Sequence, residues 1–176
     1  SQLRRIANSN VKVKKFEGMI AEVDGKYDEA IANYESSFKA DPSDLSTTRY
    51  LGNLLLKQKI WDKSIRHYKN ALDYHPNEPD LLERLGTLLV SCPDISLRDY
   101  NTARELSERA FIHKESPPEV LISSAKSLAE AYWTLGDNRN ASSFMNVALS
   151  LARNQNAPKE YIEELENRMK LFNSKN

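Results

Sequence analysis

The histidines and the single cysteine are the side chains most able to perform chemistry in this sequence. His67, His75 and His113 form neither an HExxH motif nor a pair spaced by four residues, so they lack the spacing with which one helix holds zinc. No neighbouring motif supplies a base that would activate Cys92. We therefore expect ordinary packing or surface roles for the histidines, no catalytic thiol and no metal site.

Carboxylates and glycine-rich loops are the next candidates for catalysis or for phosphate binding. Glu163, Glu164 and Glu166 lie in a highly charged segment near the C-terminus, where a solvated helix face is expected rather than a paired general acid and base. The sequence has no GxxxxGK(S/T), GxGxxG or GxSxG motif, so no segment is suited to cradle a phosphate or an oxyanion. The sequence thus predicts a protein that is not an enzyme and that uses no cofactor.

Length and charge narrow the class of protein further. The 176 residues are enough for one domain whose core needs neither a disulfide nor a metal. Lysine and arginine (25) balance aspartate and glutamate (25), so no net field attracts nucleic acid or an anionic membrane. Apolar runs such as 54–56 are far shorter than the ~20 residues that span a bilayer. We expect a soluble domain, and a piece of a longer protein because it begins with Ser1. The single cysteine fits a reducing compartment such as the cytoplasm but does not prove one, so the compartment stays open.

The elements that position these side chains are best seen in the segment 45–78. It contains two helical patterns of similar length, separated by a short break at 57–59. The residues of their apolar stripes are Leu51, Gly52 and Leu55 in the first, and Trp61, Ser64, Ile65, Tyr68, Ala71 and Leu72 in the second. Because small residues within such stripes let two helices pack closely, the segment predicts an antiparallel helical hairpin that ends at Pro76.

This unit resembles a tetratricopeptide repeat, whose period is about 34 residues. The matching residues are Leu51, Gly52, Leu55, Trp61, Ser64, Tyr68, Ala71 and Pro76, with Thr48 and Ser64 in place of the usual Trp and Ala. Similar units cover about 11–44, 79–117 and 122–155, and an amphipathic segment at about 158–172 follows as a capping helix. The resemblance implies an all-α fold, a tetratricopeptide-type α-solenoid (a superhelix of antiparallel helix pairs) in a single domain, 1–176, like the C-terminal repeats of long bacterial proteins of this family.

The glycines follow the repeat. Gly18 and Gly86 match the close-packing position of Gly52, whereas Gly25 and Gly136 lie at turns between helices.

Two segments interrupt the pattern. The polar cluster at 8–10 is able to end one helix and to cap the next. In the third unit, small residues of the second helix arrive five residues late, because Pro93 and Asp94 lengthen the loop 91–100. This insertion either serves recognition or is a tolerated extension.

The resemblance also implies where a partner binds. In this family the first helices of successive units line a concave groove, and the candidate partner-binding residues at those positions are Lys15, Met19, Arg49, Asn53, Glu83, Thr87, Lys126, Glu130 and Trp133. Some members grip the C-terminal carboxylate of chaperone tails, and Lys15 and Asn53 match that set. Met19, Glu83 and Thr87 do not, and an acid at position 83 would repel a carboxylate, so we do not expect chaperone-tail binding.

Trp133 allows two interpretations. If Leu128 and Tyr132 face the core, Trp133 is rotated by about 100° from Tyr132 and opens to the groove, where an exposed indole would anchor a partner. Alternatively, Trp133 packs under the C-terminal helix.

We predict a non-catalytic protein–protein interaction module, a scaffold that binds a peptide or protein segment of unknown identity. The alternative is the accessory C-terminal domain of a larger enzyme, because arrays resembling this one occur fused to bacterial membrane glycosyltransferases. A further hypothesis is a homo-oligomer formed through the apolar edge of the first unit, where Lys14 and Glu17 replace the usual Trp and Leu, as is tolerated at the end of a stack.

Overall fold

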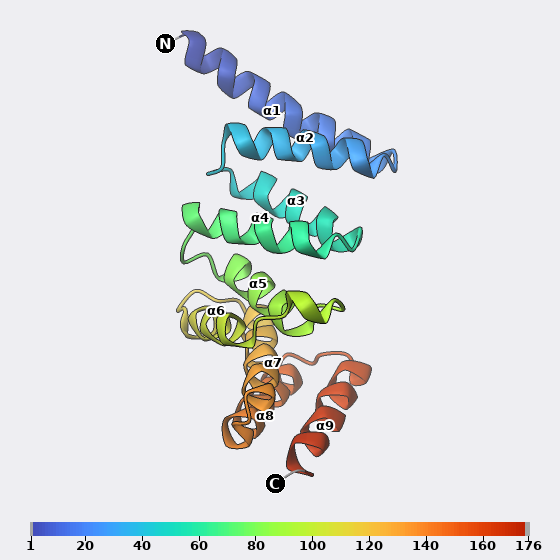
Figure 1. Cartoon of the computed structure of the whole chain (residues 1–176), viewed down its shortest axis with the longest axis vertical. Helices are drawn as coiled ribbons and strands as arrows, with labels where there is room; N and C mark the ends of the chain where they lie inside the picture. Colours follow the sequence, from blue (N-terminus) through green and yellow to red (C-terminus); the bar gives the residue numbers. More distant parts are fainter. Residues whose placement is uncertain (1, 175–176) are drawn as a thin grey trace. The chain divides into compact units, whose positions relative to one another are not determined.

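Helices make up nearly all of the chain (Figure 1). The computed structural model describes the backbone of residues 2–174 and the side chains of residues 12–174, and this part contains no strand. The elements are α1 (Gln2–Val23), α2 (Tyr27–Ala40), α3 (Leu45–Lys57), α4 (Trp61–Tyr74), α5 (Pro79–Ser91), the 3-10 helix η1 (Ile95–Leu97), α6 (Tyr100–Ile112), α7 (Pro118–Thr134), α8 (Asn138–Asn154) and α9 (Lys159–Asn173). The predicted all-α fold is confirmed.

The chain divides into two compact units, Ser1–Pro76 and Asn77–Asn176, called unit 1 and unit 2 below. Unit 1 contains α1 to α4, and unit 2 contains α5 to α9. The prediction of a single domain over 1–176 stays a prediction. Among the described helices, none is both long enough and apolar enough to cross a membrane.

Close approach within helix pairs depends on glycine, as the sequence predicts. A Cβ atom at Gly18 would lie 2.6 Å from the ring of Tyr34, and one at Gly52 would lie 2.5 Å from the hydroxyl oxygen of Tyr68. Both distances are too short for a real side chain, so each glycine admits the tyrosine of the following helix. Gly86 plays the same part beside Ser107.

The turns between paired helices use the left-handed backbone region. Gly25 and Gly136 have φ values of 74° and 86°, which glycine adopts without steric cost. Lys59 occupies the equivalent turn between α3 and α4 with φ of 59°, which is strained for a residue with a Cβ atom.

Each unit has its own core. In unit 1, Ile31 and Tyr34 of α2 pack against Leu51, Leu54 and Leu55 of α3. In unit 2, small and apolar residues of α7 and α8 pack against Leu165, Met169 and Phe172 of α9. The helix α9 therefore caps the preceding pair, with Pro158 as its N-cap residue.

Two local predictions meet different outcomes. The cluster at 8–10 does not end a helix, because α1 runs through it from Gln2 to Val23. Serine and asparagine cost a helix only a few tenths of a kcal/mol each, and no glycine or proline interrupts this stretch.

The loop between α5 and α6 is confirmed, and it contains η1, capped by Asp94. Arg98 Nε donates to the carbonyl oxygen of the buried Cys92 at 2.7 Å, so the loop is held in place.

Candidate protein-interaction site

The predicted groove residues of unit 1 lie on α1 and α3, and we call this set the unit 1 face: Lys15, Met19, Arg49 and Asn53. Lys15 Nζ contacts Asp44 Oδ2 at 2.8 Å and donates to Ser46 Oγ at 2.9 Å. Asp44 is the N-cap residue of α3 and accepts a bond from the backbone N–H of Ser46. Lys15 thus ties α1 to the first turn of α3.

Asp44 is held in its charged form. Burial alone would raise the pKa of this carboxyl, but hydrogen bonds from Lys15, Ser46 and Thr47 outweigh it and hold the pKa well below the ordinary value. Lys15 therefore already has a structural contact, which a partner would have to replace in order to bind this side chain.

A cavity of about 360 Å³ opens beside Met19. Its other lining residues are Glu22, Val23, Tyr34, Tyr50 and Lys57, so its wall is aromatic and aliphatic with one acid and one base. Tyr34 and Tyr50 stack with ring centroids 5.6 Å apart. The hydroxyl of Tyr34 donates to Glu22 Oε2 at 3.0 Å, and burial together with this bond raises the pKa of Tyr34, so the phenol stays a donor.

Asn53 completes the unit 1 face. Its side chain is exposed, whereas Arg49 is half-buried. Residues three and four apart on a helix are surface neighbours, so Asn53 lies next to both Tyr50 and Lys57, which line the cavity. The amide can both donate and accept, which suits a contact with a polypeptide backbone.

The predicted groove residues of unit 2 lie on α5 and α7, and we call this set the unit 2 face: Glu83, Thr87, Lys126, Glu130 and Trp133. Glu83 Oε1 accepts bonds from Thr87 Oγ1, at 2.9 Å, and from Ser123 Oγ. The Thr87 hydroxyl also bonds Ser127 Oγ at 2.8 Å. Burial raises the pKa of Glu83 despite these bonds.

Side chains of α9 contact the other three residues of the unit 2 face. Lys126 Nζ lies 2.6 Å from Glu164 Oε1. Glu130 forms a two-pronged ion pair with Arg168, whose Nε lies 2.6 Å from Glu130 Oε1. Trp133 stacks on Phe172 with ring centroids 4.7 Å apart. The packing of Trp133 under the C-terminal helix, the second of the two interpretations, describes its position.

The sequence predicted α9 as a cap but not these contacts. A signal for them was present, because Lys126 and Glu130 are spaced by four residues and so are Glu164 and Arg168, with the opposite order of charge. Two helices that lie side by side can pair such residues in register. Only knowledge that α9 runs along α7 turns that pattern into a prediction.

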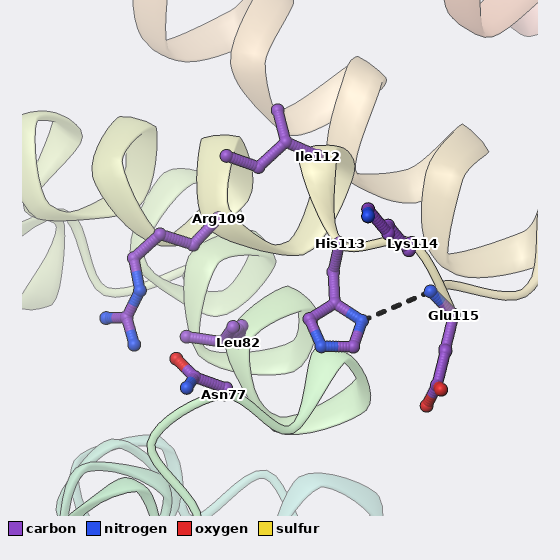
Figure 2. Close-up of a pocket in the computed structure, with 7 residues that line it drawn as sticks. All are labelled: Asn77, Leu82, Arg109, Ile112, His113, Lys114 and Glu115. Atoms are coloured by element: carbon purple, nitrogen blue, oxygen red, sulfur yellow. Dashed lines mark hydrogen bonds between the residues drawn. The ribbon is translucent and has the colours of Figure 1, made fainter.

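A second hollow lies in unit 2, at the start of α5 and the end of α6 (Figure 2). It has a volume of about 500 Å³, and its lining residues are Asn77, Leu82, Arg109, Ile112, His113, Lys114 and Glu115. Figure 2 shows the side chains of Arg109 and His113 extending toward Asn77 and Leu82, and Ile112 pointing the other way. The His113 Nδ1 atom accepts a bond from the Glu115 N–H at 3.3 Å. None of the nine predicted residues lines this hollow.

Two of the side chains considered first for chemistry, His67 and Cys92, are buried in the structure. His67 is buried, its Nε2 lies 2.8 Å from the carbonyl oxygen of Thr48, and burial lowers its pKa. Cys92 is buried as a free thiol. Among the side chains that the structure describes, no group of three or more His, Cys, Asp or Glu residues could hold a metal ion.

Comparison with known proteins identifies the repeat. A family model described as tetratricopeptide repeat matches residues 127–155. "Photosystem I assembly protein Ycf3" of Synechococcus sp. (strain WH7803) is 31% identical over 75 residues, which cover 41% of this chain and 43% of that protein. The Ycf3 protein of Rippkaea orientalis (strain PCC 8801 / RF-1) is 29% identical over 92 residues, 48% of this chain and 53% of that protein. The chain thus spans about half the length of the curated relatives it matches.

Solved structures agree on the fold. A MamA protein superimposes with a TM-score of 0.69 at 18% identity, over 83% of this chain and 75% of that one. Pseudomonas aeruginosa PilF superimposes with a TM-score of 0.62 at 16% identity, over 84% of this chain and 64% of that one. These likenesses confirm the predicted tetratricopeptide-type α-solenoid. Together with the glycine positions, the repeat matched at residues 127–155 makes the chain similar to tetratricopeptide-repeat proteins.

Proposed function

We propose that the chain is a non-catalytic protein-interaction scaffold that binds a polypeptide segment on the unit 1 face. The observation that carries the proposal is the cavity between α1 and α3, which is lined by Met19 and Tyr50 and has the exposed amide of Asn53 beside it. The curated relatives are named as assembly proteins, a role that works through protein partners.

The chemistry of this face defines the segment that it would take. An apolar or aromatic side chain fits against Met19, Val23 and Tyr50, where it loses contact with water. Glu22 and Lys57 carry opposite charges at the rim, so the face has no preference for a strongly charged segment. Asn53 then fixes the backbone of the bound segment through its amide.

The unit 2 face has a different part in this proposal. Its charged and aromatic side chains hold α9 first, through Glu164, Arg168 and Phe172. Direct contact of the unit 2 face with a partner stays a prediction, as does the alternative of an accessory domain of a larger enzyme.

Peptide selection tests the proposal without knowledge of the natural partner. A displayed library of random peptides is selected on the immobilised protein, and each enriched peptide is titrated calorimetrically into the protein and its variants. We expect Met19→Glu, which places a charge in the cavity, and Asn53→Ala to weaken binding by about tenfold or more, equivalent to ~1.4 kcal/mol. Lys69→Ala, an exposed change on α4, should have no effect.

The same titrations can contradict the proposal. Met19 packs partly against the core, so thermal unfolding of Met19→Glu is measured first, while the exposed Asn53 carries no such complication. Enriched peptides that bind both variants as tightly as the original protein would place the interaction elsewhere.

A further inference from the structure

The helix α1 carries an apolar stripe that the described part of the protein leaves uncovered. Val13, Phe16, Ile20 and Val23 are spaced by three, four and three residues, so they lie along one line of the helix. Between 47% and 88% of each residue's surface is exposed. Four large apolar side chains in one line form a contiguous patch, which is unlike the scattered exposed residues of most surfaces.

The opposite side of α1 already has a partner. Gly18 and Ala21 are buried, and Gly18 lies against Tyr34 of α2. At 100° per residue these two positions point away from the stripe. In Figure 1, α2 lies on one side of α1 within unit 1. The helix therefore has two apolar faces, of which α2 covers one.

In the next repeat, the equivalent positions form a contact between two helices. One period later, the residues that correspond to Val13 and Phe16 are Thr47 and Tyr50 of α3. Thr47 Oγ1 lies 3.3 Å from Ser37 Oγ of α2, and Tyr50 stacks on Tyr34 of α2. The same line of positions is thus a helix–helix interface in α3, so the stripe on α1 has the form of an interface for another helix.

We propose that a second copy of this chain covers the stripe, with the two α1 helices side by side and parallel. Charge selects this occupant and this direction. Lys12 lies on one flank of the stripe, and Glu17 lies on the other. In a parallel pair, opposite flanks meet at a spacing of about five residues, so Lys12 of each copy faces Glu17 of the second copy. An antiparallel pair with Val13 opposite Val23 would bring Glu17 toward Glu17 and would leave Lys12 of each copy without Glu17 of the second copy opposite it.

The existing ion pair of Glu17 does not oppose the parallel arrangement. Glu17 contacts Lys14 within its own helix at 2.6 Å, but this pair is about half exposed and contributes little stability, so it does not prevent Glu17 from turning to a second copy. This inference does not depend on the proposed function, although Val23 belongs to both surfaces.

The oligomeric state of the full chain tests the proposal. Sedimentation equilibrium from about 5 µM to about 500 µM should show the mass rising from monomer to dimer, because association follows protomer concentration. The double change Phe16→Glu and Ile20→Glu should leave a monomer throughout this range. The matched control is Ile95→Glu in unit 2, where 72% of the residue is exposed, and it should dimerise as the unchanged chain does.

Cysteine cross-linking tests the direction. Cys92 is buried, so a cysteine introduced on α1 is the accessible one. In a parallel pair, Val13→Cys and Val23→Cys each form a disulfide-linked dimer alone. In an antiparallel pair, neither does so alone, and only a mixture of the two variants cross-links.

Four results would overturn the proposal or a part of it. A monomer across the whole concentration range would do so, as would dimerisation that survives the double change. The antiparallel cross-linking pattern would remove the assignment of direction and the charge argument with it. If a synthetic peptide of residues 27–44, the segment that contacts α3, binds the monomer and the double change abolishes that binding, the stripe takes a helix of another polypeptide instead.

Discussion

The unit 1 face and the unit 2 face are built from equivalent positions of the repeat, yet their side chains have different surroundings. On the unit 1 face, Met19 lines a cavity and Asn53 is exposed beside it. On the unit 2 face, Lys126, Glu130 and Trp133 contact α9. The difference arises because α9 presents an acid, a base and an aromatic ring at the spacing of α7.

This comparison shows that a groove position and an available side chain are separate properties. Repeat geometry determines which residues lie at groove positions. Whether their side chains are available depends on which helix packs beside them. In unit 2, α9 packs beside α7 and contacts three of the five predicted residues.

Phe172→Ala should have the largest effect. Phe172 is fully buried and stacks on Trp133, so its removal leaves a cavity under α9 and should lower the free energy of unfolding of unit 2 by ~3–5 kcal/mol. Urea unfolding in a Trp61→Phe background measures this through Trp133 alone. Leu171→Ala, a largely exposed neighbour on the same helix, is the control and should cost far less. Equal losses for the two variants would mean that α9 does not depend on the stack.

Gly52→Leu is the corresponding test in unit 1. Even a Cβ atom at this position would clash with the hydroxyl of Tyr68, so we expect a loss of ~1–3 kcal/mol from overpacking. Fluorescence of Trp61 in a Trp133→Phe background reports the unfolding of unit 1. Lys69→Leu on exposed α4 serves as the control. Unchanged stability of Gly52→Leu would refute the close crossing of α3 and α4.

The ion pair between Glu130 and Arg168 should contribute about 1 kcal/mol, since it has two hydrogen bonds and is partly buried. A double-mutant cycle with Glu130→Gln and Arg168→Met measures this coupling. The matched control cycle uses the exposed pair of Lys159 and Glu163, for which the coupling should be near zero. If the two cycles give the same coupling energy, the pair of Glu130 and Arg168 stabilises the contact with α9 no more than an exposed ion pair would.

The two units should also respond to acid in opposite directions. The pKa of Asp44 is lowered in folded unit 1, so the stabilisation it provides is present above the ordinary value of 3.8 and is lost as pH falls. The pKa of Glu83 is raised in folded unit 2, so its contribution is fully present below the ordinary value of 4.5 and is lost as pH rises through the raised value.

Urea unfolding across the acidic range, with Trp61 and Trp133 as separate reporters, measures these slopes. Asp44→Asn should reduce the acid sensitivity of unit 1, and Glu83→Gln should remove the loss of stability of unit 2 with rising pH. A Glu83→Gln variant with the original slope would show that the carboxyl titrates as it does in the unfolded chain.

Much of the fold could be predicted because its signals are local. The spacing of Gly52 with the apolar residues around it predicted the hairpin, and Gly25 and Gly136 predicted turns that the backbone angles confirm. The cluster at 8–10 shows the limit of local signals, because polar residues that cap helices are also tolerated inside them, and α1 passes through this cluster.

The candidate site could be predicted less well, because it depends on contacts between distant segments. Met19 and Asn53 were found from repeat positions alone, but the cavity beside them needs Tyr34 and Tyr50, which were not among the predicted residues. The contact of Lys126 with Glu164 joins residues 38 positions apart. No periodicity within either helix shows such a pair until the two helices are placed side by side.

Backbone amide shifts on titration show which of the two faces binds a peptide. A peptide enriched by selection is added to the isotope-labelled chain, and the NMR signals of all assigned residues are followed. We expect the largest shifts within 15–23 and 49–57, with little change at 126–133. Shifts concentrated at 126–133, with 15–23 and 49–57 unchanged, would contradict it.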